Sequence, residues 1–255
     1  MVAHGSNAGV QDEGCAALWI LARSDENKTA IARAGGILAV VAGMVTHRSV
    51  AGVQESGCMA LGNLSSNNDE NQTAIARAGG IEAVVAGMMA HGLNARVQVE
   101  GCAALRNLAT TENMTAIAKA GGIEAVVAGM IAHGSDVEVQ EAGCLALGNL
   151  AWNDENNSAI VRAGGIQAVV AGMVAHRSAA GVQERGCLAL GNLAVNDVNK
   201  NRTAIVRAGG FEAVVAGMVA HSSDVEVQEE GCVALGNLGD AADGEWEEEK
   251  GEEWP

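Results

Sequence analysis

Six cysteines and six histidines are the residues whose chemistry stands out first in this sequence. They are Cys15, Cys58, Cys102, Cys144, Cys187 and Cys232, and His4, His47, His91, His133, His176 and His221. Both residue types bind zinc, and cysteine pairs form disulfides. Each His precedes its Cys by 11 residues, however, and no CxxC or HxxxH pair provides zinc-site spacing. We therefore expect no metal site and no cofactor, and we interpret the cysteines as buried thiols in a reducing compartment.

The polar residues also lack the arrangement that an enzyme needs. The repeated Ala-Gly-Gly ends a predicted helix, whereas a phosphate-binding loop opens one. The recurring carboxylates of Asp-Glu-Asn and Val-Gln-Glu have no Ser or His partner at a place found in one unit alone. The sequence therefore predicts a protein without catalytic activity.

Composition excludes further classes. The formal net charge of −16 argues against nucleic acid, whose phosphates would be repelled. No apolar run approaches the roughly 18 residues of a membrane span, and the first residues do not form a secretory signal. We expect a cytoplasmic or nuclear protein that is neither secreted nor inserted in a membrane.

The spacing of these residues reveals a tandem repeat. Successive Cys residues, and likewise successive His residues, lie 42 to 45 residues apart. Length differences fall in one Asn-, Asp- and Ser-rich segment of each unit, which is typical of a surface loop. The predicted divisions are a partial repeat at 1–24 holding only a third helix, full repeats at 25–67, 68–111, 112–153, 154–196 and 197–239, and an acidic, disordered tail at 240–255.

Each unit shows helical periodicity. In the fourth full unit, residues 156–163 form a short helix that Gly164 and Gly165 end. Ile166, Val169, Val170 and Met173 follow at helical spacing, and a third helix runs from Gln183 to about Val195. Three unequal helices, none of which buries its apolar face alone, predict an all-α solenoid.

Two motifs carry a family resemblance. Val139 to Ala151 (Val-Gln-Glu-x-Gly-Cys-x-Ala-Leu-Gly-Asn-Leu-Ala) resembles the third helix of the armadillo repeat, and Ala159 to Ile166 is similar to its first helix and following turn. The resemblance covers about residues 5–239 and implies a right-handed superhelix of three-helix repeats. The chain lacks the Pro that often follows the turn and the Trp row of importin-like members, so the subfamily, importin-like or catenin-like, stays open.

The resemblance also implies a binding groove. In the armadillo family a ladder of Asn residues on the third helices lines the concave face and binds the backbone of an extended peptide. The matching residues here are Asn63, Asn107, Asn149, Asn192 and Asn237. An acidic row, Glu55, Glu141, Glu184 and Glu229, runs beside them and would select Lys or Arg on the ligand. Arg106 and Trp152 are unit-specific candidates beside the ladder.

Two structural alternatives stand beside this interpretation. The Asn side chains could bond only to neighbouring helices, and the acids could form a solvated face. The recurring Asn-x-Ser/Thr at Asn27, Asn71, Asn113, Asn156 and Asn201 is interpreted as helix capping rather than as glycan attachment.

The sequence thus predicts a scaffold or adaptor that binds a protein or an extended peptide, with Lys or Arg as the favoured side chains. One alternative is an assembly unit that self-associates through uncapped solenoid ends. Another is an armadillo regulatory fragment of a larger signalling or nuclear-import protein.

Overall fold

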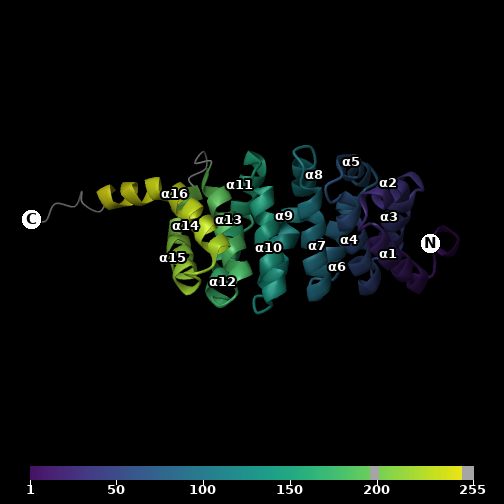
Figure 1. Ribbon diagram of the computed structural model, residues 1–255, viewed down its shortest axis with the longest axis horizontal. Coiled ribbons are helices and arrows are strands. Elements are labelled where there is room, and N and C mark those ends of the chain that lie inside the picture. The colour runs from purple at the N-terminus through teal and green to yellow at the C-terminus, as the bar shows by residue number, and fades with distance from the viewer. Residues whose placement is uncertain (196–200, 249–255) are drawn as a thin grey trace, which may run out of the picture. The chain divides into compact units, whose positions relative to one another are not determined.

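The computed structural model describes residues 1–195 and 201–248, and within them every regular element is a helix (Figure 1). The chain divides into two compact units, Met1–His133 and Gly134–Pro255. Unit 1 contains η1 (Val2–His4), α1 (Ala8–Leu21), α2 (Asp25–Arg33), α3 (Gly36–Thr46), α4 (Ala51–Ser65), α5 (Asp69–Arg77), α6 (Gly80–Ala90), α7 (Ala95–Leu108), α8 (Met114–Lys119) and α9 (Gly122–Ala132). Unit 2 contains α10 (Val137–Leu150), α11 (Asp154–Arg162), α12 (Gly165–Ala175), α13 (Ala180–Val195), α14 (Asn201–Arg207), α15 (Gly210–Ala220) and α16 (Val225–Glu248).

The turn between the first and second helix of a repeat depends on glycine. The first residue of each Gly-Gly pair has a φ between 78° and 82°, in the left-handed region that side chains other than glycine's rarely adopt. Four of these helix pairs are bent by 66° to 72°. The glycine therefore ends the first helix and redirects the chain, as its place in the sequence predicted.

The core follows the predicted helical spacing. On α12, Ile166, Val169, Val170 and Met173 are all buried. On α13, the face that contains Val182, Cys187, Leu190 and Leu193 is buried as well. The α-solenoid architecture expected from the repeat is confirmed.

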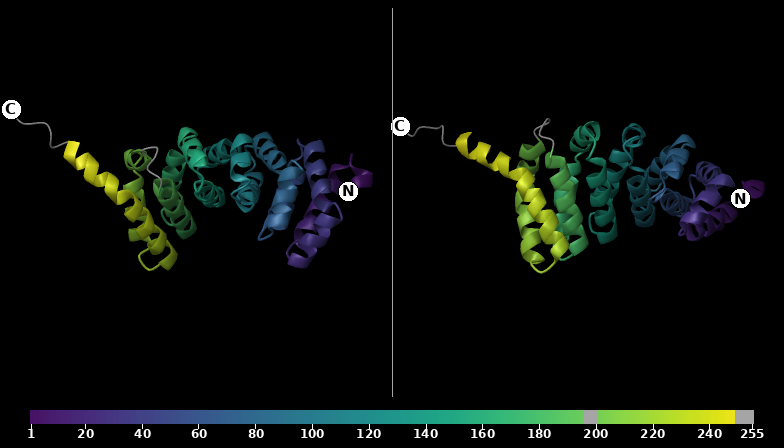
Figure 2. Two further views of the ribbon diagram at one scale, coloured as in Figure 1. Left: turned by 90° about the horizontal axis from the view of Figure 1, so that it is seen from above. Right: turned by 45° about the horizontal axis from the view of Figure 1, so that its top comes forward.

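The third helices of neighbouring repeats pack side by side within each unit: α1, α4 and α7 in unit 1, and α10, α13 and α16 in unit 2 (Figure 2). Small residues permit this approach. A Cβ on Gly62 would lie 3.5 Å from the Cα of Ala104, and one on Gly191 would lie 3.4 Å from the Cα of Ala234. Each unit therefore presents a layer of third helices, and we call its solvent-facing side the ladder face.

The structure adds detail at the two ends of the chain. A short 3-10 helix, Val2–His4, precedes the third helix of the opening partial repeat. At the other end α16 continues to Glu248, so the predicted disordered tail does not begin at residue 240. Ala241, Ala242 and the following Glu residues are good helix formers, and they extend the helix in spite of their charge. Residues 249–255 of that predicted tail lie outside the described residues.

Within the described part of the chain, no single helix is long and apolar enough to cross a membrane. Four bent pairs of consecutive helices would reach the required length and composition only together.

Candidate functional site

The cysteines are buried, as expected, except for the last one. Cys15, Cys58, Cys102, Cys144 and Cys187 are buried free thiols, whereas Cys232 is exposed. Burial raises the pKa of the Cys102 thiol to about 12. Among the described residues no group of three His, Cys, Asp or Glu side chains is placed to hold a metal ion.

The histidines connect neighbouring repeats. The Nε2 of each ring lies within hydrogen-bond distance of a backbone carbonyl in the preceding repeat, that of the residue directly after its His. Because a carbonyl only accepts hydrogen bonds, the ring Nε2 is the donor. The pairs are His47 to Gly5 (2.7 Å), His91 to Arg48 (2.9 Å), His133 to Gly92 (2.9 Å), His176 to Gly134 (2.9 Å) and His221 to Arg177 (2.7 Å). Each ring therefore lies on the loop of the preceding repeat and ties the two repeats together.

The sequence analysis did not predict a role for the glutamine of each third helix, which is buried in α1, α4, α7, α10 and α13 and half-buried in α16. In α4 the Gln54 Nε2 donates to the carbonyls of Met44 and His47, both at 3.0 Å, and so closes the end of α3. Gln183 does the same for Met173 and His176. The recurrence of Gln in every Val-Gln motif was the available signal for this role.

The ladder asparagines are half-buried on the third helices, and most of them bond to the third helix of the preceding repeat. The Asn63 Nδ2 donates to the carbonyl of Trp19 at 3.1 Å, and the Asn192 Nδ2 donates to that of Gly148 at 2.9 Å. Asn237 bonds in the same way to Gly191 at 3.2 Å. These asparagines therefore do bond to neighbouring helices, as the structural alternative proposed. The bond uses only one of the two N–H groups of each side chain, and no hydrogen bond from a described residue reaches the Oδ1 of Asn63 or Asn192.

Two ladder positions differ from this pattern. Asn107 donates to the carbonyl of Gly62 at 2.9 Å, but its Oδ1 accepts from the Nη2 and Nε of Arg106 at 2.9 and 3.2 Å. Arg106 therefore occupies the acceptor that a ligand would use at this repeat. Asn149 instead donates within its own helix, to the carbonyl of Leu145 at 2.9 Å.

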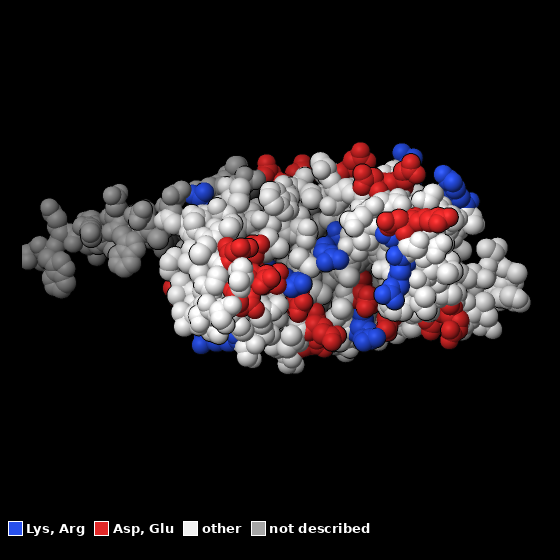
Figure 3. Space-filling view, viewed as in Figure 1, with Lys and Arg blue, Asp and Glu red and all other residues white. Residues whose placement is uncertain are grey.

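Two arginines that were not among the predicted site residues, Arg96 and Arg185, partly neutralise the acidic row. Arg96 lies 3.2 Å from Glu55, and Arg185 lies 3.2 Å from Glu141 and 3.3 Å from Glu184. On the face drawn in Figure 3, Lys and Arg are interspersed among Asp and Glu, so this face is not uniformly acidic.

Uncompensated negative charge gathers at the last repeat. Glu229 is exposed and makes no ion pair with a described residue. Partial burial raises the pKa of the neighbouring Glu230 carboxyl, and Glu184 and Glu229 raise it further. A cation would relieve this repulsion.

Trp152 follows the end of α10 and has 66% of its surface exposed. A large exposed aromatic side chain next to the ladder face suits contact with a partner.

In α2, α5 and α11 the asparagine of the Asn-x-Ser/Thr sequence lies inside the helix and is not the expected cap, whereas Asn113 stands at the N-cap of α8 without a side-chain cap hydrogen bond. In α5 the cap is Asn68, whose side chain accepts from the backbone N–H of Asn71 at 3.0 Å. Asn71 itself is buried, and its Nδ2 donates to the carbonyl of Leu64 at 2.9 Å and to that of Lys28, one repeat earlier, at 3.3 Å. Through these bonds Asn71 connects the start of α5 to the end of α4 and to α2 of the preceding repeat.

Comparisons with known proteins agree with this architecture. The family described as Armadillo-like matches residues 17–121. An engineered protein of known structure is 34% identical, with a TM-score of 0.80 and coverage of 92% of both chains. A designed armadillo repeat protein is 21% identical, with a TM-score of 0.75 and coverage of 89% of this chain and 92% of the other. No curated protein matches the chain in sequence.

These matches agree with three features of the structure: the three-helix repeats, the turns at glycine and the row of asparagines on the third helices. The chain belongs to the armadillo repeat family.

Proposed function

We propose that the chain is a scaffold without catalytic activity that binds an extended protein segment along the ladder face. The observation that carries this proposal is the half-used amide of Asn63 and Asn192. In each, the preceding repeat holds Nδ2 in place, while one N–H and the Oδ1 acceptor remain for a ligand. A donor and an acceptor in one rigid group can bind a peptide unit whatever its side chain is.

Charge favours a ligand that contains Lys or Arg. Glu141 and Glu184 share a single arginine, and Glu229 and Glu230 add further negative charge at the same end. A designed armadillo repeat protein with the same fold, 21% identical to this chain, is in complex with the peptide (KR)4. This complex supports basic side chains as the preference to be tested first.

The test is fluorescence anisotropy with labelled (KR)4, a neutral (SG)4 peptide and an acidic (ED)4 peptide. We expect (KR)4 to bind most tightly and to lose affinity as salt is raised. Asn63→Ala and Asn192→Ala should each weaken binding by about 3- to 10-fold, because each removes a hydrogen bond to the ligand.

Asn94→Ala is the matched control. Asn94 caps α7, away from the ladder face, and its side chain accepts from the N–H of Val97 at 3.2 Å. Its loss should lower stability by about 1 kcal/mol but leave peptide affinity unchanged. Equal losses of affinity in all three variants, or none in the ladder variants, would argue against binding by the ladder.

A second candidate, self-association, is favoured by apolar residues that α15 and α16 expose. Val219 and Val233 are 73% and 55% exposed, and Cys232 lies beside Val233. We expect a mass that rises with protein concentration in light scattering and becomes constant in Val233→Lys. A constant monomer mass for the unchanged chain would remove this candidate.

The location also remains a prediction. Six free thiols suit a reducing compartment, and we expect a fluorescent fusion to appear in the cytoplasm or the nucleus.

A further inference from the structure

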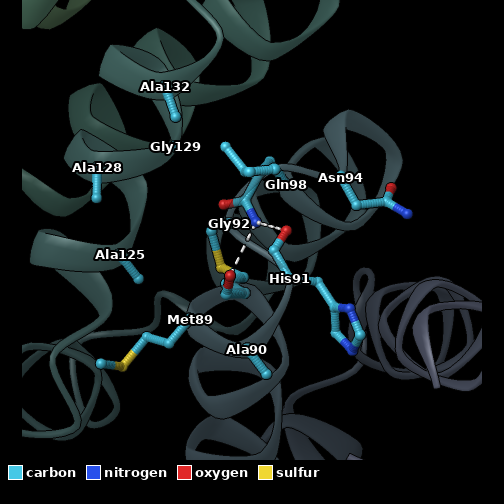
Figure 4. Close-up of a pocket in the computed structure, with 12 residues that line it drawn as sticks. Met89, Ala90, His91, Gly92, Asn94, Gln98, Ala125, Ala128, Gly129 and Ala132 are labelled. Atoms are coloured by element: carbon cyan, nitrogen blue, oxygen red, sulfur yellow. Dashed lines mark hydrogen bonds between the residues drawn. The ribbon is translucent and has the colours of Figure 1, made fainter. Parts of the chain in front are cut away.

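An open cavity of about 770 Å³ lies at the surface of unit 1, between α6, α9 and the loop that joins α6 to α7. Figure 4 shows the side chains that surround it. None of the ladder-face residues discussed above lines this cavity. It is therefore a separate feature of the molecule, and its function does not depend on peptide binding.

The walls of the cavity are apolar. Ala125, Ala128 and Ala132 of α9 form one side (Figure 4), and their small side chains leave the space open. Met89 and Leu93 also line the cavity, and they are 68% and 88% exposed. Large apolar side chains held in water at a cavity rim favour an apolar occupant, because its binding removes them from water.

The loop side of the cavity contains a glycine. The residue after the His is Gly92 here, Gly5 and Gly134 in two other repeats, Arg48 and Arg177 in two more, and Ser222 in the last. A Cβ built on Gly92 would meet no atom within 4 Å. The missing side chain therefore leaves the loop side of the cavity unfilled.

A single buried amide supplies the polarity of the cavity. Gln98 is 1% exposed, and its Nε2 donates to the carbonyls of Met88 at 2.9 Å and His91 at 3.0 Å. No hydrogen bond from a described residue reaches its Oε1, which points toward α9, 2.7 Å from where a Cβ of Gly129 would lie (Figure 4). This acceptor is accessible from the cavity, so a ligand there that donates one hydrogen bond could bind it.

The cavity offers no charge to a ligand. No Asp, Glu, Lys or Arg lines it, and the His91 ring is turned away, toward the carbonyl of Arg48. A charged ligand would lose its hydration without compensation. The cavity volume lies within the usual range for small-molecule sites, about 300 to 1,000 Å³.

We propose that this cavity binds a neutral, largely apolar small molecule that donates one hydrogen bond, from an N–H or O–H group, to Oε1 of Gln98. The apolar walls select the body of the ligand, Gln98 orients it, and the absence of charged lining residues excludes ions.

Three fluorescent probes with one aromatic framework test the proposal. N-Phenyl-1-naphthylamine is neutral and has one N–H group, its N-methyl derivative lacks that group, and 8-anilino-1-naphthalenesulfonate adds a negative charge. We expect saturable fluorescence enhancement with the first probe, affinity about tenfold weaker for the N-methyl derivative, and still weaker binding of the sulfonate.

Variants locate the binding. Gly92→Arg introduces the side chain that Arg48 and Arg177 provide at this position of two other repeats, and Ala128→Leu fills the cavity from α9. Both should abolish the enhancement. The controls Gly92→Ala and Ala171→Leu, the latter at the matching exposed position of α12, should retain it.

Circular dichroism of each variant checks the fold. Unchanged binding in folded Gly92→Arg and Ala128→Leu would overturn the proposal, as would absence of saturable binding to the unchanged protein. Equal affinity for the N-methyl derivative would overturn the role of Gln98.

Discussion

At the scale of single residues, burial decides what the cysteines can do. Burial raises the pKa of the Cys15 and Cys187 thiols to about 12, and it also raises that of Cys58. The thiolate is the reactive form, so these side chains are unreactive near neutral pH. Cys232 differs because it is exposed.

This difference predicts selective labelling of the cysteines. In the native protein, Ellman's reagent should modify Cys232 rapidly and the other five thiols only after denaturant is added. Absorbance at the thionitrobenzoate band measures the stoichiometry. In Cys232→Ser the rapid phase should vanish, and rapid modification of several thiols would show that the buried positions open.

The candidate site could be predicted only in part at this scale. Spacing along the third helix was sufficient to place Asn63 and Asn192 on its solvent-facing side, where both are half-buried. The bond from Asn63 to the carbonyl of Trp19 depends on the offset between two packed helices, which the sequence does not encode locally. The same holds for Arg96 and Glu55, which come from different repeats.

At the scale of helices, the glycines have two distinct effects. A Cβ on Gly101 of α7 would lie 2.4 Å from the Cγ of Met88, so this glycine allows α6 and α7 to approach closely. Gly236 of α16 has no atom within 4 Å of such a Cβ. Glycine within a helix that makes no close contact lowers helix stability without a packing benefit.

Alanine substitution should therefore change stability in opposite directions at these two positions. We expect Gly101→Ala to destabilise the protein by about 1 to 3 kcal/mol through overpacking, and Gly236→Ala to stabilise it by about 0.5 to 1 kcal/mol. Urea unfolding measures both. Adding Met88→Ala to Gly101→Ala should recover part of the loss, and two additive effects would contradict direct contact.

Helix types and turns followed from the sequence because local rules govern them. Gly164 ends α11 as predicted, whereas the cap is Asn153 rather than the expected Asn156. The extension of α16 to Glu248 did not follow. There a run of acids suggested disorder, while the intrinsic helix preference of Ala and Glu favoured continuation.

At the scale of the whole molecule, each repeat packs mainly on its neighbours. Within unit 1, α4 lies beside α1 and α7, and within unit 2, α13 lies beside α10 and α16. In such an array, stability is close to a sum of repeat terms and nearest-neighbour terms. The division between the compact units falls inside the predicted repeat 112–153, between α9 and α10, where a regular sequence period gave no indication of it.

Matched core substitutions test this description. Leu61 of α4 and Leu190 of α13 occupy the same position of the repeat, and both are fully buried. Leu61→Ala and Leu190→Ala should each cost about 2 to 5 kcal/mol locally. In hydrogen exchange with mass spectrometry, Leu61→Ala should lower protection chiefly in residues 1–133, and Leu190→Ala chiefly in residues 134–248. A uniform loss of protection from either substitution would mean that the chain unfolds as one cooperative body, and the additive description of its repeats would then be wrong.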